Sequence, residues 1–182
     1  MSVSAFAVLT ALGPDRVGIV DDLSRLVARQ GGNIEESKMA ILGGEFAVIM
    51  LVALAPERLD ALAADLGAQE ATLGLRLALK PTQRPEAPRD GRPYVLETVS
   101  LDTPGIVQSV TALLKVHSIN IEELETLTQP APWTGAPLFR MRATLILGPG
   151  VSVPQLRSDL TQLEAERDLD ITLRPAGSGP AE

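Results

Sequence analysis

The chain has 182 residues, a formal net charge of −7, 45% hydrophobic residues and only 3% aromatic residues. This hydrophobic content is typical of a folded protein with an aliphatic core and excludes a disordered chain. The acidic balance, without a run of Lys or Arg, argues against direct binding of nucleic acid, which needs a basic face. Cysteine is absent, which excludes disulfides, thiol catalysis and thiolate metal sites and fits a reducing compartment.

The N-terminus lacks a basic region followed by an apolar stretch, so no signal peptide is expected. The longest apolar run, Phe46 to Ala55, is too short to cross a bilayer. We therefore expect a cytoplasmic protein with no membrane partner.

The first third of the chain predicts a strand, a helix and a second strand. Val3 to Leu12 is nearly all apolar and predicts a buried strand, which Gly13-Pro14 ends. Asp15 is a candidate N-cap for the helix that follows. Gly31-Gly32 is expected to end this helix, because glycine can take a positive φ. The apolar face of the helix consists of Ile19, Leu23, Leu26 and Val27.

Two more strands, a helix and a final strand follow. Asn33 to Leu42 and Glu45 to Leu54 predict a hairpin closed by Gly43-Gly44. Pro56 suits the first turn of a second helix, and Gly74 to Lys80 is a short fourth strand. The leucines at helical spacing are Leu59, Leu62 and Leu66. The order is β-α-β-β-α-β.

This pattern occurs twice, because the stretch from Asp15 to Glu36 returns 87 positions later. The identical residues of the second copy are Asp102, Gly105, Ile106, Val107, Leu113, Asn120, Ile121, Glu122 and Glu123. The sequence predicts one domain over residues 1–80 and another over residues 93–174. A proline-rich linker over residues 81–92 joins them, and a flexible tail over residues 175–182 follows.

The second copy repeats the same elements. Its strands are predicted at Tyr94 to Asp102, Asn120 to Gln129, Leu138 to Leu147 and Asp170 to Leu173. In its first helix, Asp102 or Thr103 is the expected cap and Pro104 lies in the first turn. Ser152 is the expected cap of its second helix. The inward positions of the two helices are Val107, Val110, Leu113 and Leu114, and then Val153, Leu156, Leu160 and Leu163.

The loop from Pro130 to Pro137 replaces the Gly43-Gly44 turn in the second copy and contains the only tryptophan, Trp133. Two interpretations stay open for this side chain. It either folds back over an edge of the sheet or stands exposed as an anchor for a partner.

The strands of the first copy indicate that both faces of its sheet are covered. Phe46, Val48 and Met50 alternate with Ala47 and Ile49, so both sides of this strand are apolar. Two helices cover only one face of an antiparallel sheet. The other face is expected to be buried or to contact a neighbouring module, within the chain or between chains.

The polar ends of the repeated stretch point to a ligand shared between modules. A helix of about 14 residues, or roughly 20 Å, separates Asp15 from Asn33, so one small ligand cannot touch both within a module. A helix N-terminus suits a carboxylate, an aspartate accepts from an ammonium, and an asparagine does both. Two antiparallel modules could pair the Asp15 turn with Asn120, and the Asp102 turn with Asn33. The alternative is structural: the aspartate caps the helix and the asparagine tolerates the turn.

Catalysis and metal binding are not expected. His117, the only histidine, lies at a predicted helix end without a nucleophile or a second ligand near it in sequence. Acidic pairs such as Glu35-Glu36 and Glu122-Glu123 place neighbouring carboxylates on different faces, which is typical of solvated charge.

The motifs G-P-D-R-V-G-I-V at 13–20 and G-G-N-I-E-E at 31–36 resemble the ACT domain, a regulatory module that binds amino acids. Within that group, residues 10–20, 33–46 and 120–131 are similar to the glycine cleavage system transcriptional repressor family, whose members are tandem ACT proteins. The resemblance implies an α+β fold of two ferredoxin-like βαββαβ modules. In each, an antiparallel four-stranded sheet of order 4-1-3-2 has both helices on one face.

The resemblance also implies where a ligand binds and what the protein does. Ligands lie at module interfaces, held by the turn after the first strand and the start of the second strand. The corresponding residues are Gly13, Pro14, Asp15, Arg16, Val17, Gly18, Asn33 and Ile34, and in the second copy Asp102, Thr103, Pro104, Gly105, Asn120 and Ile121. The implied function is a non-catalytic sensor of an amino acid of the glycine or serine class, without a cofactor. It acts through a protein partner such as a transcriptional activator and not through direct contact with nucleic acid, and a homodimer is possible. A ligand-independent regulatory subunit of an amino-acid-metabolism enzyme is the alternative.

Overall fold

The computed structural model describes residues 4–83, 90–132 and 134–177. The chain forms two compact units, residues 1–86 and 87–182, which we call the first and the second module. Trp133, for which the sequence left two interpretations open, lies outside the described residues, as do residues 178–182 of the predicted tail.

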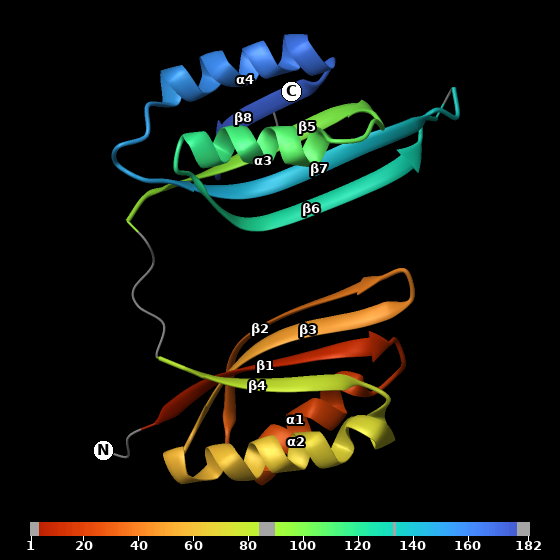
Figure 1. Cartoon of the computed structure of the whole chain (residues 1–182), viewed down its shortest axis with the longest axis vertical. Coiled ribbons are helices and arrows are strands. Elements are labelled where there is room, and N and C mark those ends of the chain that lie inside the picture. Colours follow the sequence, from red (N-terminus) through yellow and green to blue (C-terminus); the bar gives the residue numbers. More distant parts are fainter. Residues whose placement is uncertain (1–3, 84–89, 133, 178–182) are drawn as a thin grey trace. The chain divides into compact units, whose positions relative to one another are not determined.

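The first module is a four-stranded antiparallel sheet in the order β2-β3-β1-β4. Both of its helices lie on the same face of this sheet (Figure 1). The order and the one-sided helices confirm the predicted ferredoxin-like arrangement. Its elements are β1 (Ala5–Pro14), α1 (Ile19–Arg29), β2 (Asn33–Leu42), β3 (Glu45–Leu54), the 3₁₀ turn η1 (Pro56–Arg58), α2 (Leu59–Leu73) and β4 (Arg76–Thr82).

The second module has the same topology, with a sheet in the order β6-β7-β5-β8. Its two helices also share one face of their sheet (Figure 1). Its elements are β5 (Arg92–Leu101), α3 (Ile106–Val116), β6 (Asn120–Pro130), β7 (Pro137–Leu147), α4 (Val153–Arg167) and β8 (Asp170–Pro175).

Most predicted element bounds hold, and β2 and β3 match to the residue. Gly43 and Gly44 both have a positive φ, which confirms the two-residue hairpin turn between β2 and β3. The first strand was predicted to end at Leu12, but β1 continues through Gly13 and Pro14 because both remain paired with the start of β3. β4 is likewise displaced from the predicted range and runs through Pro81 and Thr82.

The two glycines after α1 have different roles. Gly31 has a φ of 68°, as predicted for a residue that ends a helix. Gly32 has no positive φ, so the prediction that it ends the helix in this way was wrong. A Cβ on Gly32 would lie 2.9 Å from Cγ1 of Val27, so this position needs glycine for space.

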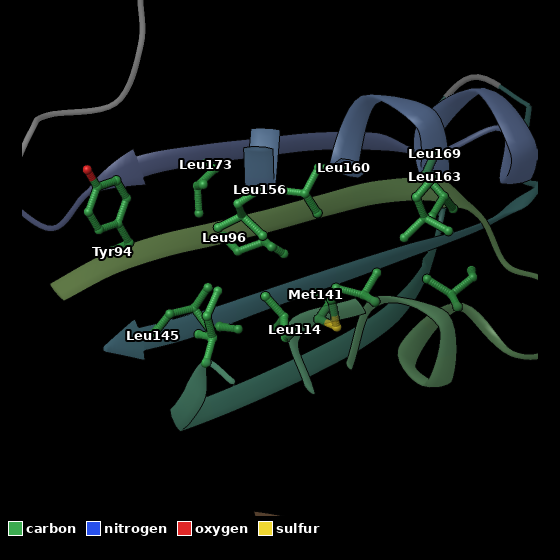
Figure 2. Close-up of a cluster of buried hydrophobic side chains, with 14 of the residues drawn as sticks. Tyr94, Leu96, Leu114, Met141, Leu145, Leu156, Leu160, Leu163, Leu169 and Leu173 are labelled. Atoms are coloured by element: carbon green, nitrogen blue, oxygen red, sulfur yellow. The ribbon is translucent and has the colours of Figure 1, made fainter. Parts of the chain in front are cut away.

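Each module has its own aliphatic core between its helices and its sheet. In the first module the predicted face of α1, Ile19, Leu23, Leu26 and Val27, is buried throughout. In the second module, leucines of α4 and β8 meet Leu96 of β5 and Met141 of β7 (Figure 2). Burial of these apolar side chains, at about 25 cal/mol per Å², is the main force that holds each module together.

One predicted helix face needs correction. On α3, the buried residues are Ile106, Ser109, Val110 and Leu114. Val107 and Leu113, which were predicted inward, are only partly buried and pack at the margin of the core. The stripe is therefore centred on Val110, and the polar Ser109 lies within it because its hydroxyl donates to the carbonyl oxygen of Gly105 at 2.9 Å.

Candidate functional site

The turn after β1 is the first part of the predicted site. It is held to the β2–β3 hairpin by the amide of Asp15, which donates to the carbonyl oxygen of Gly44 at 2.9 Å. Arg16 forms an ion pair with Asp22 of α1 at 2.8 Å, and Val17 is fully exposed. The chain then enters α1 at Gly18, which has a φ of 93°. The turn is thus fixed at both ends and open to solvent between them.

The start of α1 differs from the prediction. Its N-cap is Gly18 and not Asp15, and no side chain accepts a hydrogen bond from its first turn. The reason is geometric: Asp15 is still tied to the hairpin, and three residues separate its side chain from the first helical residue. The amides of the first turn of a helix have no intrahelical partner, so without a cap they remain available to a ligand.

The second module repeats this arrangement. The amide of Asp102 donates to the carbonyl oxygen of Pro137 at 2.9 Å. Gly105, with a φ of 94°, is the N-cap of α3, again without a side-chain cap. The predicted caps Asp102 and Thr103 are therefore wrong for the same reason as Asp15. The carboxylate of Asp102 accepts instead from the hydroxyl of Thr128 on β6, at 3.4 Å.

The asparagines form the second part of the predicted site, at the starts of β2 and β6. Asn33 is exposed, and its Nδ2 donates to Oε1 of Glu35 at 2.8 Å. Asn120 is exposed at the equivalent position of the second module. The adjoining Ile34 and Ile121 pack against their cores, so they support the asparagines and are not positioned to contact a ligand.

A β-bulge follows each asparagine, and the sequence did not predict either one. The strand register shifts between Ile34 and Glu36 in β2, and between Ile121 and Glu123 in β6. The residues between them, Glu35 and Glu122, have no cross-strand partner in the register. Such bulges commonly re-aim side chains next to functional sites. Glu35, the unpaired residue of the first bulge, is the one whose carboxylate accepts from Asn33.

A cavity of about 570 Å³ lies at the asparagine end of the first module. Ala53, the register partner of Asn33, lines it together with Glu35, its hydrogen-bond partner. The other lining residues are Ser4, Ala5, Phe6, Thr82 and Gln83. The cavity has room for an amino acid and offers a carboxylate and an apolar wall.

Within one module, the turn and the asparagine lie at opposite ends of the sheet. Asn33 lies opposite Ala53, and Ala53 lies opposite Phe6 on β1. The rest of β1, from Phe6 to Pro14, separates this end from the turn by roughly 27 Å at 3.4 Å per residue. A small ligand therefore cannot bridge the two within a module, as the sequence predicted.

Gly13 has a packing role at the end of β1. It is buried, and a Cβ there would lie 2.6 Å from the carbonyl oxygen of Gly74. The rest of the predicted turn is exposed: Pro14, Asp15, Arg16, Val17 and Gly18 in the first module, and Asp102, Thr103, Pro104 and Gly105 in the second. Gly13 thus brings the turn close to the end of α2 and is not itself accessible to a ligand.

The sequence also missed a repeated polar contact between the two helices of each module. In the first module, Nε2 of Gln30 donates to Oδ2 of Asp65 at 2.7 Å. In the second, Nε2 of His117 lies 2.8 Å from Oδ2 of Asp159. His117 was expected to be a surface or capping residue; it is the C-cap residue of α3, and 13% of its side chain is exposed. Its position at the end of α3 is confirmed.

A second repeated contact joins the later helix to the last strand. The carboxylate of Glu70 accepts from the amide of Leu77, and that of Glu164 accepts from the amide of Ile171, both at 2.7 Å. The signal for both contacts was present as Asp65 with Glu70 and Asp159 with Glu164, 94 positions apart. It was missed because the longer loop between β6 and β7 and one further residue between β7 and α4 change the spacing from 87.

The described residues contain no cluster of three or more histidine or acidic side chains that could hold a metal ion. No helix in the part of the chain that the structure describes is long and apolar enough to cross a membrane. In each module the exposed polar groups of the turn and the exposed asparagine lie at opposite ends of the sheet.

Comparison with known proteins agrees with this fold. The ACT domain profile matches residues 5–80. The glycine cleavage system transcriptional repressor of Escherichia coli K12 is 39% identical over 132 residues, which are 72% of this chain and 69% of that protein. The homologous repressor of Shigella flexneri matches to the same extent.

Two solved structures resemble the chain over nearly its whole length. A protein from Galdieria sulphuraria is 35% identical with a TM-score of 0.82, covering 96% of this chain and 99% of that one. A structure named for a glycine cleavage system transcriptional repressor is 24% identical with a TM-score of 0.71, covering 95% and 98%. At that identity the second likeness shows the fold alone. Together with the match to the Escherichia coli protein, the repeated module shows that this chain belongs to the ACT domain family, among the tandem proteins related to the glycine cleavage system transcriptional repressor.

Proposed function

We propose that the protein is a non-catalytic regulator that senses a free amino acid of the glycine or serine class. One observation carries the proposal: α1 and α3 start without a side-chain cap, although an aspartate stands at each turn. The structural alternative needed these aspartates as caps. Because Asp15 does not cap, its carboxylate and the first-turn amides of α1 are available together. The carboxylate of Asp102 accepts from Thr128 and keeps further lone pairs for a ligand.

The chemistry of each half suits one end of an amino acid. The amides at the start of α1, at the positive end of the helix dipole, suit the α-carboxylate. Asp15 accepts from the ammonium, as Asp102 does in the second module. An asparagine supplied by another module completes the site with one donor and one acceptor. We pair the Asp15 turn with Asn120, and the Asp102 turn with Asn33.

The regulatory role extends that of the relatives, which are named as transcriptional repressors of the glycine cleavage system. The net charge of −7 disfavours contact with DNA phosphates. We therefore propose that the protein acts in the cytoplasm through a protein partner, such as a transcriptional activator, and that bound amino acid changes this contact.

Calorimetric titration with each of the twenty amino acids tests the sensing step, with glycine and serine expected to bind. Asp15→Ala and Asn120→Ala should each weaken binding by about tenfold or more, since each removes a charge-assisted or buried hydrogen bond. Asp60→Ala is the matched control, because Asp60 is an exposed carboxylate in the first turn of α2, another helix N-terminus.

The proposal that the protein senses an amino acid is wrong if no amino acid gives heat on titration or raises the melting temperature. Pull-down of partners from native extract, with and without the amino acid, then tests the regulatory step. A partner captured equally in both conditions would favour the ligand-independent subunit of an enzyme instead.

A further inference from the structure

The sheet of the first module has an outer face, opposite its helices, that is largely apolar. Residues directly opposite in an antiparallel pair share a face, so the register assigns this surface. Its middle rows, read from β2 to β4, are Glu36–Leu51–Val8–Lys80, Lys38–Ile49–Thr10–Ala78 and Ala40–Ala47–Leu12–Arg76. We use the term outer face for these residues. The two central strands supply almost only apolar side chains to it.

This surface is exposed within the module. Ile49 is 51% exposed and Leu12 is 50% exposed, although both are large and apolar. A cavity of about 230 Å³ opens between β1, β3 and β2, lined by Val8, Ile49 and Leu51 together with Glu36, Ser37 and Lys38. Contiguous apolar surface with a polar rim and a hollow is typical of a contact site.

The fold itself does not require this surface to be apolar. In the second module, Arg142 and Glu97 occupy the register positions of Ile49 and Thr10. They form an ion pair, which Arg174 of β8 extends. The same backbone therefore carries an ion pair at the centre of the outer face in the second module, where the first module has Thr10 and Ile49.

The charges at the rim of the outer face indicate which partner would cover it. Glu36 on the β2 edge and Lys80 on the β4 edge lie in one row, separated by Leu51 and Val8. Both are exposed, and within the described ranges neither has an ion-pair partner. A two-fold rotation about an axis parallel to the strands exchanges the two edges and keeps each row at its level. It would place Glu36 of one copy over Lys80 of the other, twice.

We propose that the first module packs its outer face on the same face of a second copy of this chain, around such an axis. The contact is isologous, so one patch serves both partners. Face-to-face sheets pack about 10 Å apart with interdigitated side chains, and the cavity beside Ile49 receives a side chain of the facing copy. The row of acid, two apolar residues and base is complementary to its own reverse, so a second copy matches it by symmetry. The proposal does not depend on the binding of an amino acid.

Sedimentation velocity of the full chain over a concentration series tests the proposal, and a dimer is expected. Ile49→Arg should abolish the dimer, because it buries an unpaired charge at the centre of the contact. Loss of the fold is not expected, since the second module has an arginine at this register position; circular dichroism checks this. Met39→Arg is the matched control. Met39 is 53% exposed on the neighbouring strand but pairs with Val48, so it lies on the helix side of the sheet, and its substitution should leave the dimer intact.

The charges test the symmetry. Glu36→Lys and Lys80→Glu should each weaken the dimer by about tenfold, because each places like charges together at two points. The double variant should restore the affinity. A wild-type chain that is monomeric throughout, a dimer that survives Ile49→Arg, or a double variant that is weaker than both single ones would each overturn the proposal. In the first case, loss of stability in Ile49→Arg would indicate that the second module of the same chain covers the face.

Discussion

The two modules have the same contacts between their helices and their last strands, but different outer faces. Gln30–Asp65 and Glu70–Leu77 in the first module correspond to His117–Asp159 and Glu164–Ile171 in the second. At the centre of the outer face, the pair of Thr10 and Ile49 corresponds to the ion pair of Glu97 and Arg142. Contacts that hold a helix in place recur in both modules, and surfaces that only the environment constrains do not.

Equivalent substitutions in the two separate cores test whether the modules are independent folding units. Phe46 and Phe139 occupy the same position in β3 and β7 and are both buried. Phe46→Ala and Phe139→Ala should each cost about 3–5 kcal/mol of unfolding free energy. The loss should be confined to the module that carries the substitution, because each module has its own core.

Hydrogen exchange followed peptide by peptide in urea measures this. Phe46→Ala should accelerate exchange over the first module and leave the second unchanged, and Phe139→Ala should do the reverse. Equal acceleration in both modules would show that they unfold together and would contradict independent folding.

The end of the first strand is the next largest difference. Gly13 corresponds to Ser100, and a Cβ at Gly13 would lie 2.6 Å from the carbonyl oxygen of Gly74. Gly13→Ser should therefore destabilise the first module by about 1–3 kcal/mol, the usual cost of overpacking. Ser100→Gly should have a smaller effect. Thermal unfolding of both variants gives the comparison, and equal losses would mean that the close approach of Gly13 to Gly74 has no consequence.

The helix–helix contact predicts a smaller effect. Asp65→Ala and Asp159→Ala should each cost about 1–2 kcal/mol, because each leaves a largely buried polar partner unpaired. His117→Gln should retain most of the stability of the second module, since Gln30 makes the equivalent contact with an aspartate in the first module. If His117→Gln is as damaging as Asp159→Ala in denaturant titrations, the two contacts are not equivalent.

The sequence predicted the fold, because apolar periodicity and paired glycines report directly on strands and turns. Gly43-Gly44 fixed the ends of β2 and β3, since two positive φ values close a two-residue hairpin. The start of α1 was misplaced because a cap is a matter of geometry: Asp15 has the right chemistry but is bonded to the hairpin. The bulge at Glu35 was not predictable, because a polar residue on an exposed edge strand looks the same in either register.

The last prediction separates a capping role from a binding role for the turn aspartates. Ser152 caps α4 by accepting from the amide of Gln155, although at 3.4 Å. Ser152→Ala should therefore cost about 0.5–1 kcal/mol. Asp15→Ala removes no such bond, because α1 has no side-chain cap, and should change the unfolding free energy by less than about 0.5 kcal/mol. The stability of the ligand-free protein in urea measures both. A loss in Asp15→Ala as large as that in Ser152→Ala would show that Asp15 is a structural residue. An unchanged stability together with weaker binding of glycine would instead assign Asp15 to the ligand.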